Sequence, residues 1–329
     1  MKYILEEGTE LFNKQLNKYS FPFNGLNNEP IERWCERLEP FAPFIHDIYC
    51  SLPDINGEDH FSVALGKQYL DDCAQLLDYL CKTQKYKAVV TLNGNYTNLY
   101  MQQKQELCKQ VVEQVKKYNI YGCVVSDFSM ACILNMLVPN LVLNTSCNVP
   151  QYSVEDMLIW KEYANIEVIN PSRNSSRDIP LLKEFKEHGF KVKLLLNELC
   201  DIHCPNMCMH CARPFDEHTI CFGHASKNGP LHSCFVLPRW LNILDEYVDI
   251  YKLTGRYNRD INFALKQFVY YLLRTDNCDI NEFYQDLNIS IPLDEFPDKL
   301  LYCQGKCSNC SLCIDIYKQF FNKMNFIGR

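Results

Sequence analysis

The run KVKLLLN, residues 191–197, gives the clearest indication of how this chain folds. Short runs rich in aliphatic and β-branched residues are typical of strands that are buried on both faces of a parallel sheet. Runs of this kind recur along the chain. They are FIHDIY (44–49), KAVVTL (87–92), YGCVVS (121–126), LVLNT (141–145), IEVIN (166–170), KVKLLLN (191–197), CFVL (234–237) and DIYKL (249–253).

Helical patterns separate most of these strands. YMQQKQELCKQVVEQVKKYN (100–119) has apolar residues at helical spacing, SVEDMLIWKEYA (153–164) opens with a Ser-x-x-Asp capping signal, and DIPLLKEFKEHG (178–189) ends on glycine. About eight alternating strands predict a parallel α/β fold of the (β/α)8 barrel type. An open doubly wound sheet is the alternative, but its Gly-x-Gly-x-x-Gly turn does not occur. We expect a barrel domain at 1–275 and a short cysteine-rich C-terminal extension at 276–329.

Composition and the first residues narrow the class of protein. The chain has 329 residues, 47% of them hydrophobic, which is enough for a large core, and its net charge of −7 neither indicates nor excludes a nucleic-acid partner. No run of 18 apolar residues predicts a membrane span. The start MKYILEEGTELF lacks a secretory leader, so we expect a cytoplasmic protein. In that reducing compartment, clusters among 19 cysteines indicate metal or Fe–S ligation rather than disulfides.

The residues that follow the strands are the candidates for chemistry, because barrel active sites form at the C-terminal ends of strands. Polar residues occupy many of these positions. The segment ELCDIHCPNMCMHC (198–211) directly follows the strand at 191–197 and places four thiols at the predicted mouth. The other residues at strand ends are Cys50, Asn93, Asn95, Ser126, Asp127, Asn144 to Cys147, Asn170 and Arg256.

Several segments, taken in order, resemble the collagenase-like U32 peptidase family, which includes oxygen-independent hydroxylases. The resemblance covers roughly residues 40–275. It rests on KAVVTLNGNYTN, YGCVVSD, VPNLVLNTSCNV, LLLNELCDIHCP, HAS with Cys234 after it, and DEYVDIYKLTGR. The family implies a barrel-like fold. Some members carry a [4Fe–4S] cluster held by four cysteines, and members that modify tRNA, ribosomal RNA or ubiquinone are associated with hydroxylation without molecular oxygen.

The resemblance also implies site residues. Its Asn-x-x-Cys-x-x-x-Cys-Pro element matches Asn197, Cys200, Cys204 and Pro205, and Cys234 matches a later cysteine that precedes a Pro-Arg element. These residues imply three ligands of a main cluster. The fourth ligand stays open among Cys50, Cys208, Cys211 and Cys221.

A Lys-x-x-Gly-Arg element of the family matches Lys252, Gly255 and Arg256. We expect Lys252 and Arg256 to hold an anionic group of the substrate as catalytic residues. The alternative is that both are buried ion-pair partners at the barrel rim. Asp127 likewise has a structural alternative, because it precedes FSMACILNML and would serve as a helix N-cap.

Two features leave the metal chemistry open. Cys204, Cys208 and Cys211 have the Cys-x3-Cys-x2-Cys spacing of radical S-adenosylmethionine enzymes, although that motif normally follows the first strand of its barrel. The tail YCQGKCSNCSLC (302–313) would supply four thiolates to a second cluster or a structural zinc, or lend one to the main site. Its ligands are Cys303, Cys307, Cys310 and Cys313.

The function that the sequence favours is redox modification by a U32-like iron–sulfur enzyme, of the oxygen-independent hydroxylation type, with peptidase activity as the family label. The alternatives are a radical S-adenosylmethionine enzyme and a non-enzymatic binding module that metal stabilises. We expect a small-molecule, peptide or RNA substrate and, for redox chemistry, an electron-donor protein. Scattered cysteines such as Cys108 and Cys123 are expected to be core residues.

Overall fold

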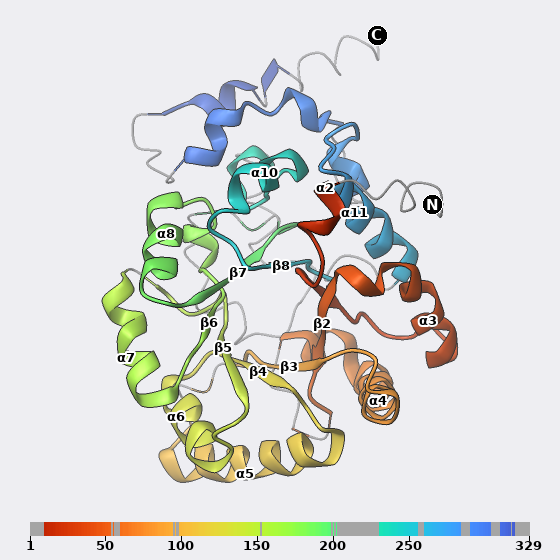
Figure 1. Cartoon of the computed structure of the whole chain (residues 1–329), viewed down its shortest axis with the longest axis vertical. Helices are drawn as coiled ribbons and strands as arrows, with labels where there is room; N and C mark the ends of the chain where they lie inside the picture. Colours follow the sequence, from red (N-terminus) through yellow and green to blue (C-terminus); the bar gives the residue numbers. More distant parts are fainter. Residues whose placement is uncertain are drawn as a thin grey trace.

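Eight parallel strands close into one barrel within the part of the chain that the structure describes. The computed structural model describes residues 10–53, 55, 60–94, 96, 99–151, 153–198, 200, 202, 230–255, 260–283, 290–303, 310–316, 318 and 319, with the backbone alone for 60–66. The strands follow chain order around the barrel, which confirms the predicted fold (Figure 1). They are β1 (Tyr19–Pro22), β2 (Ile45–Ser51), β3 (Ala88–Leu92), β4 (Gly122–Val125), β5 (Val142–Thr145), β6 (Val168–Ile169), β7 (Lys191–Leu195) and β8 (Ile250–Lys252).

Helices surround the ring of strands (Figure 1). The predicted capping signal is confirmed at Ser153, which accepts the N–H of Asp156 while the Asp156 carboxylate accepts the N–H of Ser153. Gly189, with φ +74°, follows the end of its helix as predicted. The helices are α2 (Glu10–Asn13), α3 (Ile31–Leu38), α4 (His60–Thr83), α5 (Met101–Tyr118), α6 (Phe128–Leu137), α7 (Val154–Ala164), α8 (Ile179–Glu187), α10 (Leu241–Leu244) and α11 (Ile261–Leu273).

One predicted strand is wrong and one strand was not predicted. CFVL (234–237) does not join the barrel; it is an extended segment whose Val236 N–H donates to the carbonyl of Leu196, beyond the end of β7, at 2.8 Å. The eighth position belongs to β1, which pairs with both β2 and β8. Its last residue is Pro22, and a proline argues against a strand unless it stands at an end, as here.

The barrel interior holds a small apolar cluster of Tyr49, Val89 and Val124. Cys50 faces the other way, since side chains alternate along a strand, and it belongs to the large core that the helices share. Cys108 and Cys123 are buried in that same core, as expected. Cys50 is thereby directed away from the barrel interior.

A buried ion pair crosses the interior one layer nearer the N-terminal ends of the strands. Lys193 Nζ lies 2.8 and 3.1 Å from the two carboxylate oxygens of Asp47, and both side chains are 1% exposed. Ser20 Oγ donates to the same carboxylate, and His46 Nδ1 lies 2.7 Å from it. Because β2 and β7 are not neighbours in the barrel, the pair ties opposite walls together.

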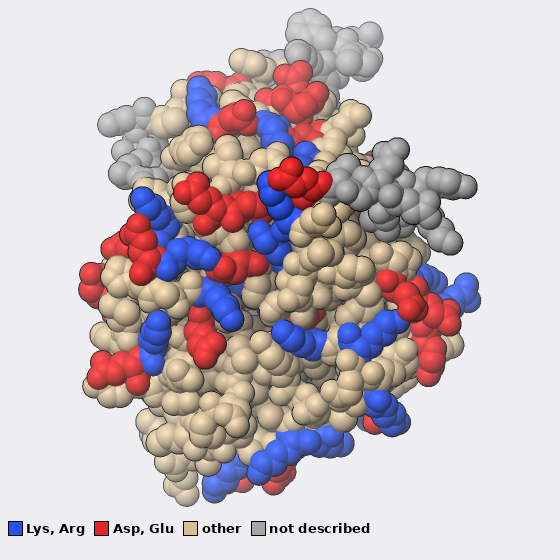
Figure 2. All heavy atoms as spheres, viewed as in Figure 1, with Lys and Arg blue, Asp and Glu red and all other residues tan. Residues whose placement is uncertain are grey.

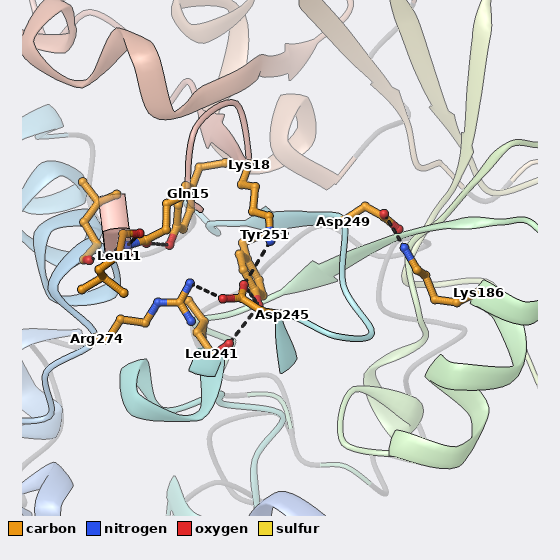
Figure 3. A network of polar contacts seen from close by, with 11 residues as sticks. Leu11, Gln15, Lys18, Lys186, Leu241, Asp245, Asp249, Tyr251 and Arg274 are labelled. Atoms are coloured by element: carbon orange, nitrogen blue, oxygen red, sulfur yellow. Dashed lines mark hydrogen bonds and ion pairs between the residues drawn. The ribbon is translucent and has the colours of Figure 1, made fainter. Parts of the chain in front are cut away.

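The seam between the first and last strands is held by Asp245, the residue after α10. Lys18 Nζ and the hydroxyl of Tyr251 both donate to Asp245 Oδ1, at 3.1 and 2.9 Å, and Arg274 Nη2 lies 2.9 Å from Oδ2 (Figure 3). Lys18 precedes β1, Tyr251 lies in β8, and Arg274 follows α11. One carboxylate therefore links both ends of the barrel domain.

The segment that follows α11 packs on the barrel through Arg239, the arginine of the Pro-Arg element. Arg239 pairs with Asp276 and Asp298 and donates to the carbonyls of Leu293 and Phe296. Residues from this segment join the main hydrophobic core; they are Ile280, Phe283, Ile291, Leu293, Phe296, Leu300 and Leu301.

Acidic and basic side chains are interspersed over the face drawn in Figure 2. None of the helices in the described part of the chain is both long enough and apolar enough to cross a membrane.

Candidate functional site at the barrel mouth

Arg173 lies at the C-terminal end of the barrel, four residues after β6, in the short 3-10 helix Arg173–Ser175. Its side chain is 2% exposed. Nη1 donates to Asn148 Oδ1 at 2.6 Å, and Nε lies 3.6 Å from Glu198 Oε2. Asn148 follows β5 and Glu198 follows β7, so this guanidinium joins three successive strand ends.

Cys200 and Cys234 lie side by side next to this ion pair. The N–H of Cys200 donates to Glu198 Oε1 at 3.3 Å. The N–H and the thiol of Cys234 both donate to the carbonyl of Cys200, at 2.9 and 3.1 Å. The structure therefore brings together two of the three cysteines that the family resemblance implies as ligands, although 34 positions separate them.

A second buried arginine, Arg177, holds the segment that carries Cys234. Its Nη2 donates to the carbonyls of Ser233 and Phe235, one on each side of the cysteine. Its guanidinium carbon lies 5.3 Å from the centre of the Trp240 ring. Arg177 thereby fixes the backbone at Cys234.

The cluster is rich in positive charge. Burial alone would lower the pKa of Arg173, but Cys200, Cys147 and the Glu198 carboxylate raise it well above the ordinary value. Burial lowers the pKa of Arg177, and Cys234, Cys303 and Cys313 oppose this lowering. Two buried guanidiniums thus face one buried carboxylate among the described residues of this cluster, an imbalance that favours a further anionic group.

The thiol of Cys234 is fully enclosed. Burial raises its pKa well above the ordinary value, Cys200 and Glu198 act in the same direction, and Arg173 and Arg177 act against them. A thiolate is the form that ligates metals, so metal binding at Cys234 would displace a proton.

Lys252 lies inside the barrel at the end of β8. Its Nζ is 4.1 Å from the centre of the Tyr49 ring, and the side chain is buried. The Tyr49 hydroxyl donates to the carbonyl of Leu253 at 2.5 Å. Lys252 is therefore held by a cation–π contact directly below the mouth. Arg256 lies outside the described residues.

Asn197 and Gly255, two further matched family residues that the structure describes, have structural roles. Asn197 Oδ1 accepts the N–H of Thr254 at 2.6 Å, and its Nδ2 donates to Gln267 Oε1 at 2.6 Å, which locks the end of β7 to the loop after β8. A Cβ at Gly255 would lie 1.7 Å from Asn24 Oδ1. Glycine is therefore required where the loops after β8 and β1 approach each other.

The remaining cysteine predictions are only partly covered by the structure. Cys204, Cys208, Cys211, Cys221 and Cys307 lie outside the described residues. No three His, Cys, Asp or Glu side chains converge as a metal-ligand group within the described ranges. Among the strands that the structure describes, only β8 follows the Cys-x3-Cys-x2-Cys motif, a late position for a radical S-adenosylmethionine site.

The structure describes three of the four tail cysteines, Cys303, Cys310 and Cys313. Cys303 follows the 3-10 helix Asp298–Tyr302, and Cys313 packs against the main core. Both raise the pKa of Arg177, against the lowering that burial causes, as Cys234 does. Cys310 is exposed. Cys234 and two tail cysteines thus raise the pKa of the same guanidinium.

Arg173 and Arg177 were not singled out from the sequence as functional residues, whereas Glu198 lay in the candidate segment 198–211. A signal was present, because NPSRNSSR (170–177) is a polar run directly after a predicted strand. Asp127 has the structural role that the sequence offered as its alternative, the N-cap of α6. It accepts the N–H of Met130 at 2.9 Å and pairs with Lys104.

Fold and site together define a parallel (β/α)8 barrel whose mouth combines cysteines with buried arginines. Residues 46–193, from β2 into β7, match the model of peptidase family U32, which confirms the resemblance seen in the sequence. The matched region ends before Glu198, Cys200 and Cys234.

A relative and two solved structures extend the comparison. The uncharacterized protease MJ1657 of Methanocaldococcus jannaschii is 23% identical over 305 residues, which cover 82% of this chain and 87% of the relative. The U32 peptidase Mk0906 is similar over 72% of this chain and 92% of its own, with 12% identity and a TM-score of 0.47. A glycerophosphodiester phosphodiesterase from Parabacteroides distasonis is similar over 73% and 93%, with 10% identity and a TM-score of 0.45.

Proposed function

We propose that this chain is an iron–sulfur enzyme of the U32 type that carries a [4Fe–4S] cluster at the barrel mouth. Cys200 and Cys234 are two of its ligands, Cys204 is a third, and one further cysteine completes the set. The observation that carries the proposal is the pair of neighbouring cysteines beside two buried guanidiniums, which have one buried carboxylate near them among the described residues. A cluster held by four thiolates is a net anion and fits that imbalance.

The donor set also fits the group chemically. Thiolates are the ligands of iron–sulfur clusters, and the buried mouth would exclude water from them. When bound, the cluster supplies one-electron redox chemistry. We propose oxygen-independent hydroxylation as the reaction type, on a small-molecule, peptide or RNA substrate, with an electron-donor protein as partner.

The chain's own residues would bind and orient the substrate. Lys252 Nζ sits over Tyr49 inside the barrel, so it offers a fixed positive charge to an anionic group that enters from the mouth. Arg256 follows four residues later and is proposed to act with it. Asn197 and Gly255 hold the loop between these two side chains in place.

Peptide hydrolysis is the second candidate, because the matched family is a peptidase family and the relative from Methanocaldococcus jannaschii is named a protease. The two candidates differ in their need for iron. A peptidase that requires no iron would cleave peptides in protein freed of iron, whereas the redox enzyme would lose its activity.

Anaerobic purification tests the proposal. The expected protein is brown, absorbs near 400 nm and contains about four irons per cubane with matching sulfide. Cys200→Ala and Cys234→Ala should each abolish that absorbance at the mouth, and Cys123→Ala, a buried core cysteine in β4, is the matched control that should stay brown.

Each alternative has its own outcome. Stoichiometric zinc without iron, from cells rich in iron, would refute the cluster and favour a metal-stabilised binding module. If Cys208→Ala and Cys211→Ala bleach the protein, Cys200→Ala does not, and the protein cleaves S-adenosylmethionine reductively, the radical enzyme is the correct assignment.

A further inference from the structure

Arg173 has unused hydrogen-bonding capacity in a buried position. Of its three nitrogens only Nη1 makes a hydrogen bond to a described residue, Asn148; Nε and Nη2 have no such partner there. The side chain is only 2% exposed. A buried guanidinium with unmet N–H donors is costly, and a structure that keeps one usually has a group for it to meet.

The groups around Arg173 indicate what it meets. Cys200, Cys147, Glu198 and Cys234 all raise the pKa of Arg173, against the lowering that burial causes. A continuous set of contacts leads from the guanidinium to the cysteine pair: Nε lies 3.6 Å from Glu198, whose other oxygen accepts the N–H of Cys200. The carbonyl of Cys200 in turn accepts the thiol of Cys234.

Arg173 is also held still. Asn148 fixes one side of its guanidinium and Glu198 the other, and both come from strand ends of the barrel. A charge fixed by such a frame costs no rearrangement when an anion binds. Arg177 differs, because its Nη2 is occupied by the two backbone carbonyls around Cys234.

We propose that Arg173 is a positioning residue whose guanidinium provides the counter-charge for the thiolate-ligated centre at Cys200 and Cys234. This rests on the proposed function for the identity of the metal group, but a divalent metal held by three or more thiolates at this place would also be an anionic centre. Arg173 donates N–H groups to the ligand sulfurs or the cluster, stabilises the bound metal and favours the more negative, reduced state.

The test uses the full chain with Cys307→Ala and Cys310→Ala, so that the tail does not contribute metal. In this background, Arg173→Gln removes the charge and Arg173→Lys keeps it. Arg274→Gln is the matched control, because Arg274 is another buried arginine paired with a carboxylate, at the seam of the barrel. Melting temperature and circular dichroism show that each variant is folded.

Two quantities are measured. Zinc affinity at a single pH, by competition with a chromophoric chelator, should fall about tenfold in Arg173→Gln and change less than about threefold in Arg173→Lys. In anaerobically prepared protein, loss of the charge should shift the balance between oxidised and reduced cluster about tenfold toward the oxidised form, which is about 59 mV for one electron. Arg274→Gln should change neither quantity.

The outcomes separate this inference from the proposed function. If the wild type carries a cluster and Arg173→Gln keeps both zinc affinity and potential, the inference is wrong and the function stands. If the protein takes zinc but never iron, and Arg173→Gln weakens zinc binding, the function fails and the inference stands. Absence of any metal from both the wild type and the background protein overturns both. An equal loss in Arg274→Gln, or a full loss in Arg173→Lys, overturns the inference.

Discussion

Two buried ion pairs in the barrel differ in how completely their charges are balanced. In the lower layer, nearer the N-terminal ends of the strands, Asp47 accepts hydrogen bonds from Lys193 and Ser20 and lies beside His46. The carboxylate is therefore surrounded by donors. At the mouth Arg173 has one hydrogen bond to the described residues and one distant carboxylate. The satisfied pair stabilises the barrel, whereas the unmet N–H donors of Arg173 are suited to a ligand.

The largest effect is expected in the lower layer. Lys193→Met would leave the Asp47 carboxylate buried without its main partner, so we expect a loss of about 3–5 kcal/mol in the free energy of unfolding, measured with urea. Replacing both residues, Asp47→Asn with Lys193→Met, should recover most of this loss. A single variant that costs less than about 1 kcal/mol would contradict the assigned role.

The same pair predicts an acid dependence. Burial alone would raise the pKa of Asp47, but Lys193 and His46 hold it below the ordinary carboxyl value. A lowered pKa means that this stabilisation is present above the unfolded value, about 3.9, and is lost as the pH falls toward the folded value. Wild type should therefore lose more stability below about pH 4 than Asp47→Asn, and parallel curves would refute this.

A smaller loss is expected at the mouth from Arg177→Met. The change removes two hydrogen bonds that one nitrogen donates, to the carbonyls of Ser233 and Phe235; at about 1.5 kcal/mol each, the lower limit for a charged donor, the free energy of unfolding should fall by about 3 kcal/mol. Lys183→Met, on an exposed part of α8, is the control and should be neutral. Urea denaturation of metal-free protein measures both, and equal effects would show that Arg177 does not support Cys234.

The loops above the mouth should respond more weakly. Gly255→Ala would force its Cβ against Asn24, and such overpacking costs about 1–3 kcal/mol in the free energy of unfolding. Asn24→Ala in the same chain should relieve the contact, so the double variant should be more stable than the sum of the single effects. Strict additivity in urea denaturation would argue against a direct collision.

The smallest effect is expected at α7, away from both the Asp47–Lys193 layer and the barrel mouth. Ser153→Ala would remove the cap of α7 and lower the free energy of unfolding by about 1 kcal/mol. The cysteine pair and both buried guanidiniums should be untouched. A change in the absorbance of the mouth cluster in this variant would mean that general stability, rather than local charge, controls the site.

The barrel was predictable because its strands are apolar runs separated by amphipathic or capped helices. CFVL was mistaken for a strand since apolarity alone does not distinguish a barrel strand from an extended segment packed beside one. β1 was missed because its sequence ends in Pro22, and proline argues against a strand. The side to which Cys50 points was also beyond reach, because strands buried on both faces lack the alternation that assigns a side.

The site was predictable as a location and in part as a ligand pair. Cys200 and Cys234 came from the family resemblance, and the structure places them in contact. The partners of Arg173 are a different matter: Asn148 and Glu198 lie 25 positions on either side of it, and only the closed barrel brings them together. A polar run after a strand indicates a mouth residue but not its partners.

The seam at Asp245 has a consequence for how the chain acquires its fold. Lys18 and Asp245 are 227 positions apart, and Arg274 comes later still. During synthesis from the N-terminus, β1 can pair with β2 early, but its other edge stays without a partner until β8 has emerged. Contacts of such long range form slowly, and an open strand edge favours association with other chains in the meantime. Barrel closure therefore belongs to the final steps of folding, after translation has passed α11.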